Sequence, residues 1–366
     1  SFTVTLTDDT SVTAPGTQFT YTIANGTART AVTGQPEVKT GEGKVTFGTA
    51  TNVTPGDPAT TVTVAMPSGT TSVTVPLVFA DHSTAGIYRY TITQSALDAT
   101  QTAAGFKTKD AGDGGPVTYY LDVYVRSDGK AYGAALAKVD GTDAATQLLD
   151  ANKVAGFENL YSYADNTTTS ESYDVTISKT LGTGGMEETT KAFPFTVLVT
   201  LPQNDTYVNC ANMTFNITNT DTTFPTTITA DESGVVAEFN GTMIGGKSIT
   251  IKGLPAGTQV QVKETVSALD NYNIAAKVEN MSDYAAVEST NYDTPANSNT
   301  HTEDTYITTG KVQGNTTADG VIDYLNYRAA ISPTGLVLRF APYIMMLGAG
   351  IVILALTRRR KNANVA

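Results

Sequence analysis

The sequence predicts an all-β protein built from two immunoglobulin-like β-sandwiches in tandem. Residues 2–6, 87–93 and 119–125 alternate apolar and polar side chains, and a period of two is typical of strands with one buried face. Gly, Pro, Asp and Asn separate these short stretches, as expected for the turns of a sandwich. The chain has 366 residues, about the length of two domains.

The composition excludes several classes of function. The chain carries 23 basic and 35 acidic residues, so we expect no nucleic-acid partner, because binding phosphates requires a surplus of positive charge. One cysteine, Cys210, builds neither a disulfide framework nor a zinc site. His82 and His301 lie far apart among polar residues, which favours solvated surface histidines. We therefore expect no enzyme, no metal and no cofactor.

The strand pattern restarts once along the chain. The stretch 161–173 is rich in Ser, Thr, Asp and Asn, which is typical of a linker. A new alternating stretch follows at once. We therefore place the first domain at residues 1–165, the linker at 166–171 and the second domain at 172–328.

The C-terminal residues 331–366 differ from all that precedes them. Residues 340–357 are apolar and uncharged, and a run of roughly 18 such residues can span a bilayer. Residues 358–361 are all basic, which should keep the C-terminus cytoplasmic. We expect a transmembrane helix at 340–357, with the bulk of the chain outside the cell. A buried core helix is the alternative.

The motif Pro333-Thr334-Gly335, the apolar span and the basic tail stand in a fixed order. This order resembles the cell-wall sorting signal of Gram-positive surface proteins, in which a sortase cuts between Thr and Gly. The common signal, LPxTG, has one more residue between Pro and Thr, and the shorter form resembles the PTG signals of some backbone pilins. The resemblance implies that Thr334 is the acyl donor. It also implies a class C-type pilin sortase and peptidoglycan as partners, with transient anchoring in the membrane before cleavage.

Three predicted strands of the second domain end an apolar face with a polar residue. Alternate residues of a strand share one face, and the faces in 175–179, 260–264 and 322–326 end in Lys179, Glu264 and Asn326. Burial lowers the pKa of a lysine and raises that of a glutamate. A neutral amine that meets the Asn amide can then displace ammonia and form an isopeptide bond, while the carboxyl moves protons. An ordinary Lys179–Glu264 ion pair is the alternative.

Several longer motifs point to one family. They are KGLPAGT at 252–258, VKET at 262–265, YLNY at 324–327, AGIYRY at 85–90, YLDVYV at 120–125 and GFENLY at 156–161. Over nearly the whole chain they resemble the FctA-type, isopeptide-containing backbone (major) pilins of Gram-positive sortase-assembled pili. The resemblance implies Cna_B-like sandwiches, a Lys179–Asn326 crosslink and Glu264 as its catalytic acid. It implies an extracellular, wall-anchored shaft subunit that supports adhesion.

The first domain departs from the family pattern. Asn159 stands at the acceptor position, but Val4 replaces the lysine and Gln94 replaces the glutamate. A valine is no nucleophile, and a glutamine carries no carboxyl proton. We expect no Lys–Asn bond in this domain, and Gln94 hydrogen-bonded to Asn159 across the core. A Thr–Gln ester is an alternative crosslink.

Polymerisation requires an amine that attacks the Thr334 acyl-enzyme. The resemblance implies a lysine just before the last strand of the first domain, and Lys153 occupies this place in a loop bounded by Asn and Gly. Lys138 is the second candidate, and a surface role without linkage is the alternative for Lys153. The implied partners are neighbouring copies of the chain, accessory pilins and a host receptor. The alternative function is a wall-anchored adhesin or an accessory tip or base pilin that binds a host ligand.

Overall fold

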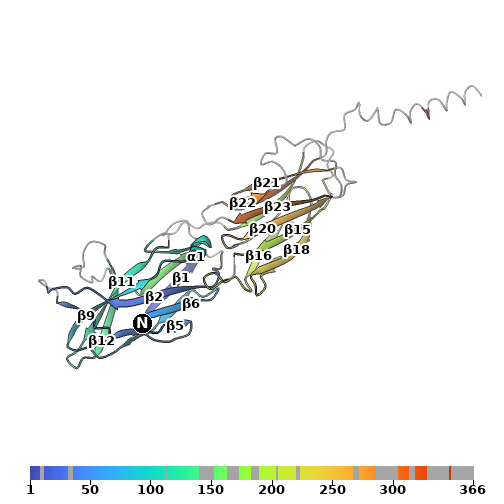
Figure 1. The fold of residues 1–366 in the computed structure, drawn as a ribbon. Helices are drawn as coiled ribbons and strands as arrows, with labels where there is room; N and C mark the ends of the chain where they lie inside the picture. The colour runs from blue at the N-terminus through green and yellow to red at the C-terminus, as the bar shows by residue number, and fades with distance from the viewer. Residues whose placement is uncertain are drawn as a thin grey trace, which may run out of the picture.

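The computed structural model is almost wholly β, with a short helix, α1 (Ala99–Ala103), among the described residues. The described residues are 1–8, 12–31, 36–111, 114–139, 152–162, 173–182, 189–202, 205–219, 223–266, 272–285, 304–312, 318–327 and 346–347. Figure 1 shows the strands gathered in two units that follow one another along the molecule, the first blue to green and the second yellow to orange. The all-β prediction is confirmed.

Some predictions fall on residues that are not described. These are the linker at 166–171, the motif Pro333-Thr334-Gly335, the basic tail at 358–361 and all but two residues of the span at 340–357. In the part of the chain that is described, no helix is both long and apolar enough to cross a membrane.

The described strands of the N-terminal unit form three sheets. The first has the order β10 (Phe106–Thr108), β13 (Gly156–Tyr161), β1 (Phe2–Asp8), β7 (Ser72–Val75). The second has the order β12 (Ala131–Lys138), β11 (Val117–Val125), β9 (Gly86–Gln94), β2 (Thr17–Asn25), β6 (Thr61–Met66), β5 (Val53–Pro55), with β3 (Val38–Thr40) beside β9. The third pairs β4 (Val45–Phe47) with β8 (Leu77–Phe79). The first and last strands, β1 and β13, are parallel neighbours.

In the C-terminal unit the described strands form two sheets. One has the order β17 (Thr227–Thr229), β16 (Thr214–Asn219), β19 (Lys247–Ile251), β14 (Val175–Leu181), β24 (Gly320–Tyr327), β21 (Asn273–Glu279). The other has the order β18 (Val235–Met243), β15 (Phe193–Thr200), β20 (Gln259–Val266), β23 (Asp304–Val312), β22 (Met281–Ala285). Its first and last strands, β14 and β24, are again parallel neighbours. The domain boundaries at 1–165 and 172–328 stay predictions, but each sheet of described strands lies wholly on one side of residues 163–172.

Alternation of side chains explains why these stretches become strands. Along β1, β14 and β24 the buried residues alternate with less buried ones, and threonines occupy much of the other face in β1 and β14. Burying one Val, Leu, Ile or Phe side chain contributes about 1.5–3 kcal/mol, so only the observed parity keeps the apolar stripe out of water. Lys179, Glu264 and Asn326 continue these stripes and are therefore carried into the interior.

The two units meet through backbone and aromatic contacts. Gly16 and Asn209 exchange two backbone hydrogen bonds of 2.8 Å, and the Thr17 hydroxyl donates to the Tyr207 carbonyl at 2.7 Å. Tyr161, at the end of β13, stacks on Tyr173, just before β14, with ring centroids 6.1 Å apart. The end of the first unit therefore lies close to the start of the second.

His82 is not the solvated surface residue that its polar neighbours predict. The residue is 5% exposed, and its ring packs against Tyr88 and Tyr90. Nε2 lies 2.9 Å from the Tyr90 hydroxyl, which accepts the backbone N–H groups of Glu42 and Lys44. With both acceptor positions taken, the hydroxyl donates its proton to Nε2, which favours the neutral imidazole. His301 lies outside the described residues.

We expect acid to destabilise the N-terminal unit through His82. Burial lowers the pKa of His82, so the fold prefers the neutral ring. This contribution to stability is complete above the ordinary histidine pKa of about 6.5 and is lost as the pH falls below it toward the folded pKa. Thermal unfolding of residues 1–330 from about pH 8 to about pH 5 measures the loss. His82→Gln should flatten the profile, and equal slopes for both proteins would contradict the assignment.

Candidate crosslinking site in the C-terminal unit

Three strands bring the predicted polar residues together across the sandwich. Lys179 lies on β14 and Asn326 on its neighbour β24, while Glu264 faces them from β20 of the opposite sheet. Their relative exposures are 1%, 0% and 0% for Lys179, Glu264 and Asn326. The three side chains meet in the interior, although Glu264 is 85 positions from Lys179 and 62 from Asn326 in the sequence.

The carboxyl of Glu264 lies between the other two groups. Lys179 Nζ is 2.9 Å from Glu264 Oε1 and 3.1 Å from Oε2. Asn326 Nδ2 donates to Glu264 Oε1 at 2.7 Å. The amine and the carboxamide thus share one carboxyl, which can accept a proton from either and return it.

Strand register explains why the amine and the amide lie close to one another. In the parallel pair β14–β24, Lys179 is level with Tyr324 and Leu181 is level with Asn326. Residues two apart share a face, so all four side chains point into the core. The amide is therefore diagonal to the lysine on the adjacent strand, within reach of its long side chain.

Aromatic rings surround the amine. Lys179 Nζ lies 4.5 Å from the centroid of the Phe193 ring and 5.8 Å from that of Phe195. Phe195 also packs edge-on against Tyr324. These rings exclude water from the site. Their role was not predicted from the sequence, although the spacing of Phe193 and Phe195 on one face of β15 was a signal that could have identified them.

Burial perturbs both titratable groups in the site. Desolvation lowers the pKa of Lys179 to about 8, although Glu264 opposes the shift. Desolvation raises the pKa of Glu264, although Lys179 and Asn326 oppose it. Because each charged form is disfavoured, moving the proton from ammonium to carboxylate costs little. The site therefore gives access to a neutral amine beside a protonated acid.

The amide of Asn326 completes this chemistry. Its Oδ1 is buried and has no hydrogen-bond partner among the described groups, an arrangement that is costly in an interior. Rotating the amide by half a turn places Oδ1 against Glu264 Oε1, and a protonated carboxyl can then donate to it. Such a hydrogen bond polarises the carbonyl and makes Cγ electrophilic.

The strands of the N-terminal unit have positions equivalent to those of the site, but these positions carry no amine and no carboxyl. Val4 is level with Phe157 and Leu6 with Asn159 in the parallel β1–β13 pair, as Lys179 and Leu181 are with Tyr324 and Asn326. Gln94 is paired with Tyr21, as Glu264 is with Phe195. Val4 therefore stands at the position of the lysine, and Gln94 at that of the acid.

In the N-terminal unit, hydrogen bonds between buried side chains take the place of the reactive amine and carboxyl. Gln94 Nε2 donates to Asn159 Oδ1 at 2.6 Å, the contact that the sequence predicts. The Tyr21 hydroxyl donates to Gln94 Oε1 at 3.0 Å, and Asn159 Nδ2 reaches the Thr5 carbonyl at 3.5 Å. This network satisfies the buried amides and contains no amine and no carboxyl.

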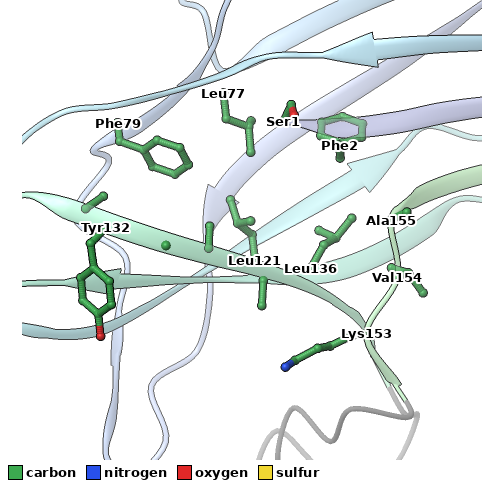
Figure 2. Close-up of a pocket in the computed structure, with 14 residues that line it drawn as sticks. Ser1, Phe2, Leu77, Phe79, Leu121, Tyr132, Leu136, Lys153, Val154 and Ala155 are labelled. Atoms are coloured by element: carbon green, nitrogen blue, oxygen red, sulfur yellow. The ribbon is translucent and has the colours of Figure 1, made fainter.

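Lys153 lies at the rim of a groove of about 640 Å³. The residue is exposed and precedes β13 by three positions, and it forms an isolated bridge with Ala137 of β12. Figure 2 shows Lys153 beside Val154 and Ala155, and the groove is also lined by the apolar residues Leu77, Phe79, Leu121 and Leu136. Lys138, the second candidate, forms an ion pair with Asp110, with Nζ 2.6 Å from Oδ1.

The C-terminal unit matches a known sequence family. A family model described as a domain of unknown function (DUF7601) covers residues 173–323. No curated protein matches the sequence.

Solved structures of the major pilin from Streptococcus pyogenes are similar to the chain. One is 17% identical, covers 89% of this chain and 97% of its own, and has a TM-score of 0.53. The T-13 major pilin from one serotype is 18% identical, covers 90% and 97%, and has a TM-score of 0.53. The major pilin from a further serotype is 16% identical, covers 90% and 97%, and has a TM-score of 0.53. The chain therefore has the fold of the streptococcal major pilins.

Proposed function

We propose that the chain is the structural shaft subunit of a covalent, sortase-polymerised pilus on a Gram-positive cell surface. The observation that carries the proposal is the buried Lys179–Glu264–Asn326 site, which joins the first and last strands of the C-terminal unit. The pilin fold supports it. A polymer under tension gains from a covalent tie at this place, because the tie replaces a hydrogen-bond ladder that force can separate.

The crosslink forms once, in the folded chain. The neutral Nζ of Lys179 attacks Cγ of Asn326 while protonated Glu264 donates to Oδ1. A new Nζ–Cγ bond forms, the Cγ–Nδ2 bond breaks, and Nδ2 leaves as ammonia after Glu264 transfers to it one proton taken from Nζ. The carboxyl ends in its starting state, so the chemistry is single-turnover self-crosslinking without a cofactor.

Assembly joins Thr334 of one copy to Lys153 of the next copy. Thr334, in the sorting motif, supplies the acyl group to a class C-type sortase, and Lys153 of the next copy supplies the amine. The apolar span at 340–357 holds the precursor in the membrane until cleavage, and the finished polymer is joined to peptidoglycan. Neighbouring copies and accessory pilins are the partners of the shaft, which supports adhesion to a host.

Lys153→Ala should abolish polymerisation. We expect recombinant chain and a class C-type sortase to give a ladder of high-molecular-weight species in denaturing gels, and the variant to give monomer alone, because the acyl-enzyme lacks its amine. Lys138→Ala is the matched control and should leave the ladder intact. An unchanged ladder from Lys153→Ala would contradict the role of this lysine, and no ladder from the unaltered chain would favour a wall-anchored adhesin.

A further inference from the structure

The position of Lys153 in the N-terminal unit decides which part of that unit is stretched in a polymer. Lys153 stands three residues before β13 (Gly156–Tyr161), the last strand of the unit. A subunit held at Lys153 and at its C-terminus is loaded along residues 153–162 and then into the second unit. Residues 1–152 branch off before the loaded segment and are not part of it.

The loaded strand, β13, can lengthen very little under tension. A strand rises about 3.2–3.4 Å per residue, close to the maximum span of about 3.3–3.6 Å. β13 is also held on both sides, by β1 in parallel and by β10 in antiparallel pairing. At its start, Val154 N–H donates to the Leu136 carbonyl, and the Ala155 carbonyl accepts from Thr3 N–H, both at 3.0 Å. Tension therefore stretches covalent backbone that is already extended.

The C-terminal unit is loaded in a different way. Force enters at the start of β14 and leaves at the end of β24, and these parallel neighbours are then pulled in shear. Without a bond between them, separation of the two strands exposes the whole unit. A Lys179–Asn326 bond carries the force directly from β14 to β24, and the chain between residues 180 and 325 is then not loaded.

We infer that tension crosses the N-terminal unit along β13 alone, so that this unit stays folded under load without a crosslink. The inference rests on the proposed function, because it takes Lys153 as the point of attachment. It accounts for the difference between the two cores: the unit loaded through both terminal strands has Lys179, Glu264 and Asn326, and the unit loaded through one strand has a hydrogen-bonded Gln94–Asn159 pair in their place.

Single-molecule force spectroscopy with two attachment points tests the inference. Residues 1–330 are pulled from a handle after residue 330 and from a cysteine at position 153 (Lys153→Cys) or at position 1 (Ser1→Cys). Burial raises the pKa of Cys210 to about 12, so its thiol does not compete for the handle. Pulling from position 1 should release about 150 residues, on the order of 500 Å, as the N-terminal unit unfolds. Pulling from position 153 should release at most the linker at 166–171, about 20 Å.

A variant separates this inference from the crosslink itself. In Glu264→Ala the C-terminal unit should unfold from both attachment points, while the N-terminal unit still releases nothing when pulled from position 153. Release of the N-terminal unit from position 153 would overturn the inference whether or not the second unit is crosslinked. The intact mass of the same samples reports the crosslink independently, so the two failures are distinguishable.

Discussion

Glu264→Ala should leave the chain at the full mass of its sequence, whereas the unaltered protein should be lighter by one ammonia. The expectation follows from the site, in which the carboxyl of Glu264 is the group placed to take a proton from Lys179 and polarise Asn326. Without it, the buried amine has no local acceptor for its proton and the amide is not activated. Intact mass spectrometry of residues 1–330 measures the difference directly.

The same substitution should lower the stability of the C-terminal unit strongly. The bond closes a loop of roughly 150 residues, and by analogy with a disulfide such a closure contributes about 5 kcal/mol. Removing one partner of a buried pair adds a cost of about 3–5 kcal/mol, since Lys179 is left unpaired. We expect the melting temperature of this unit to fall by on the order of 15–40 °C, and that of the N-terminal unit to stay unchanged.

Two further variants separate the chemistry from the packing. Glu264→Gln keeps the shape of the side chain but carries no transferable proton, so it should also retain the full mass. Glu238→Ala removes an exposed glutamate from β18 of the same sheet and should still lose ammonia. Full mass in the unaltered protein would leave Lys179 and Glu264 as a buried ion pair and would remove the covalent part of the proposed function.

The faces of the strands were predictable from the sequence because burial acts locally. Alternation alone carries Lys179, Glu264 and Asn326 to the buried face of their strands, and the structure has all three inside. Parity also predicts that Val4 and Gln94 are buried in the first unit, as they are. Local pattern suffices here because a shift of one residue would expose the whole apolar stripe.

Contacts between distant segments were not predictable in the same way. Nothing in the local pattern states that β14 lies beside β24, or that Phe193 and Phe195 surround the amine, because strand order depends on packing of the whole chain. The family resemblance implied which residues react, but not their register. His82 shows a related limit, since its immediate sequence neighbours are polar while its ring packs against Tyr88 and Tyr90, which follow on the next strand, β9.

The equivalent strand positions of the two units predict that a crosslink can be introduced into the N-terminal unit. The acceptor Asn159 is present and fully buried. Phe19 and Tyr21 are buried on one face of β2, at the positions that Phe193 and Phe195 occupy around the amine of the second unit. The missing groups are an amine at Val4 and a carboxyl at Gln94.

Val4→Lys combined with Gln94→Glu should therefore make the chain lose a second ammonia. The new bond would join β1 to β13 and close a loop of roughly 155 residues, which by analogy with a disulfide raises the stability of the N-terminal unit by about 5 kcal/mol. Val4→Lys alone should destabilise the unit, because an ammonium is then buried without a carboxylate. Adding Asn159→Ala to the pair removes the acceptor and should restore the mass to one ammonia lost. A folded double variant with only one ammonia lost would show that register and aromatic walls are not enough to make the site react.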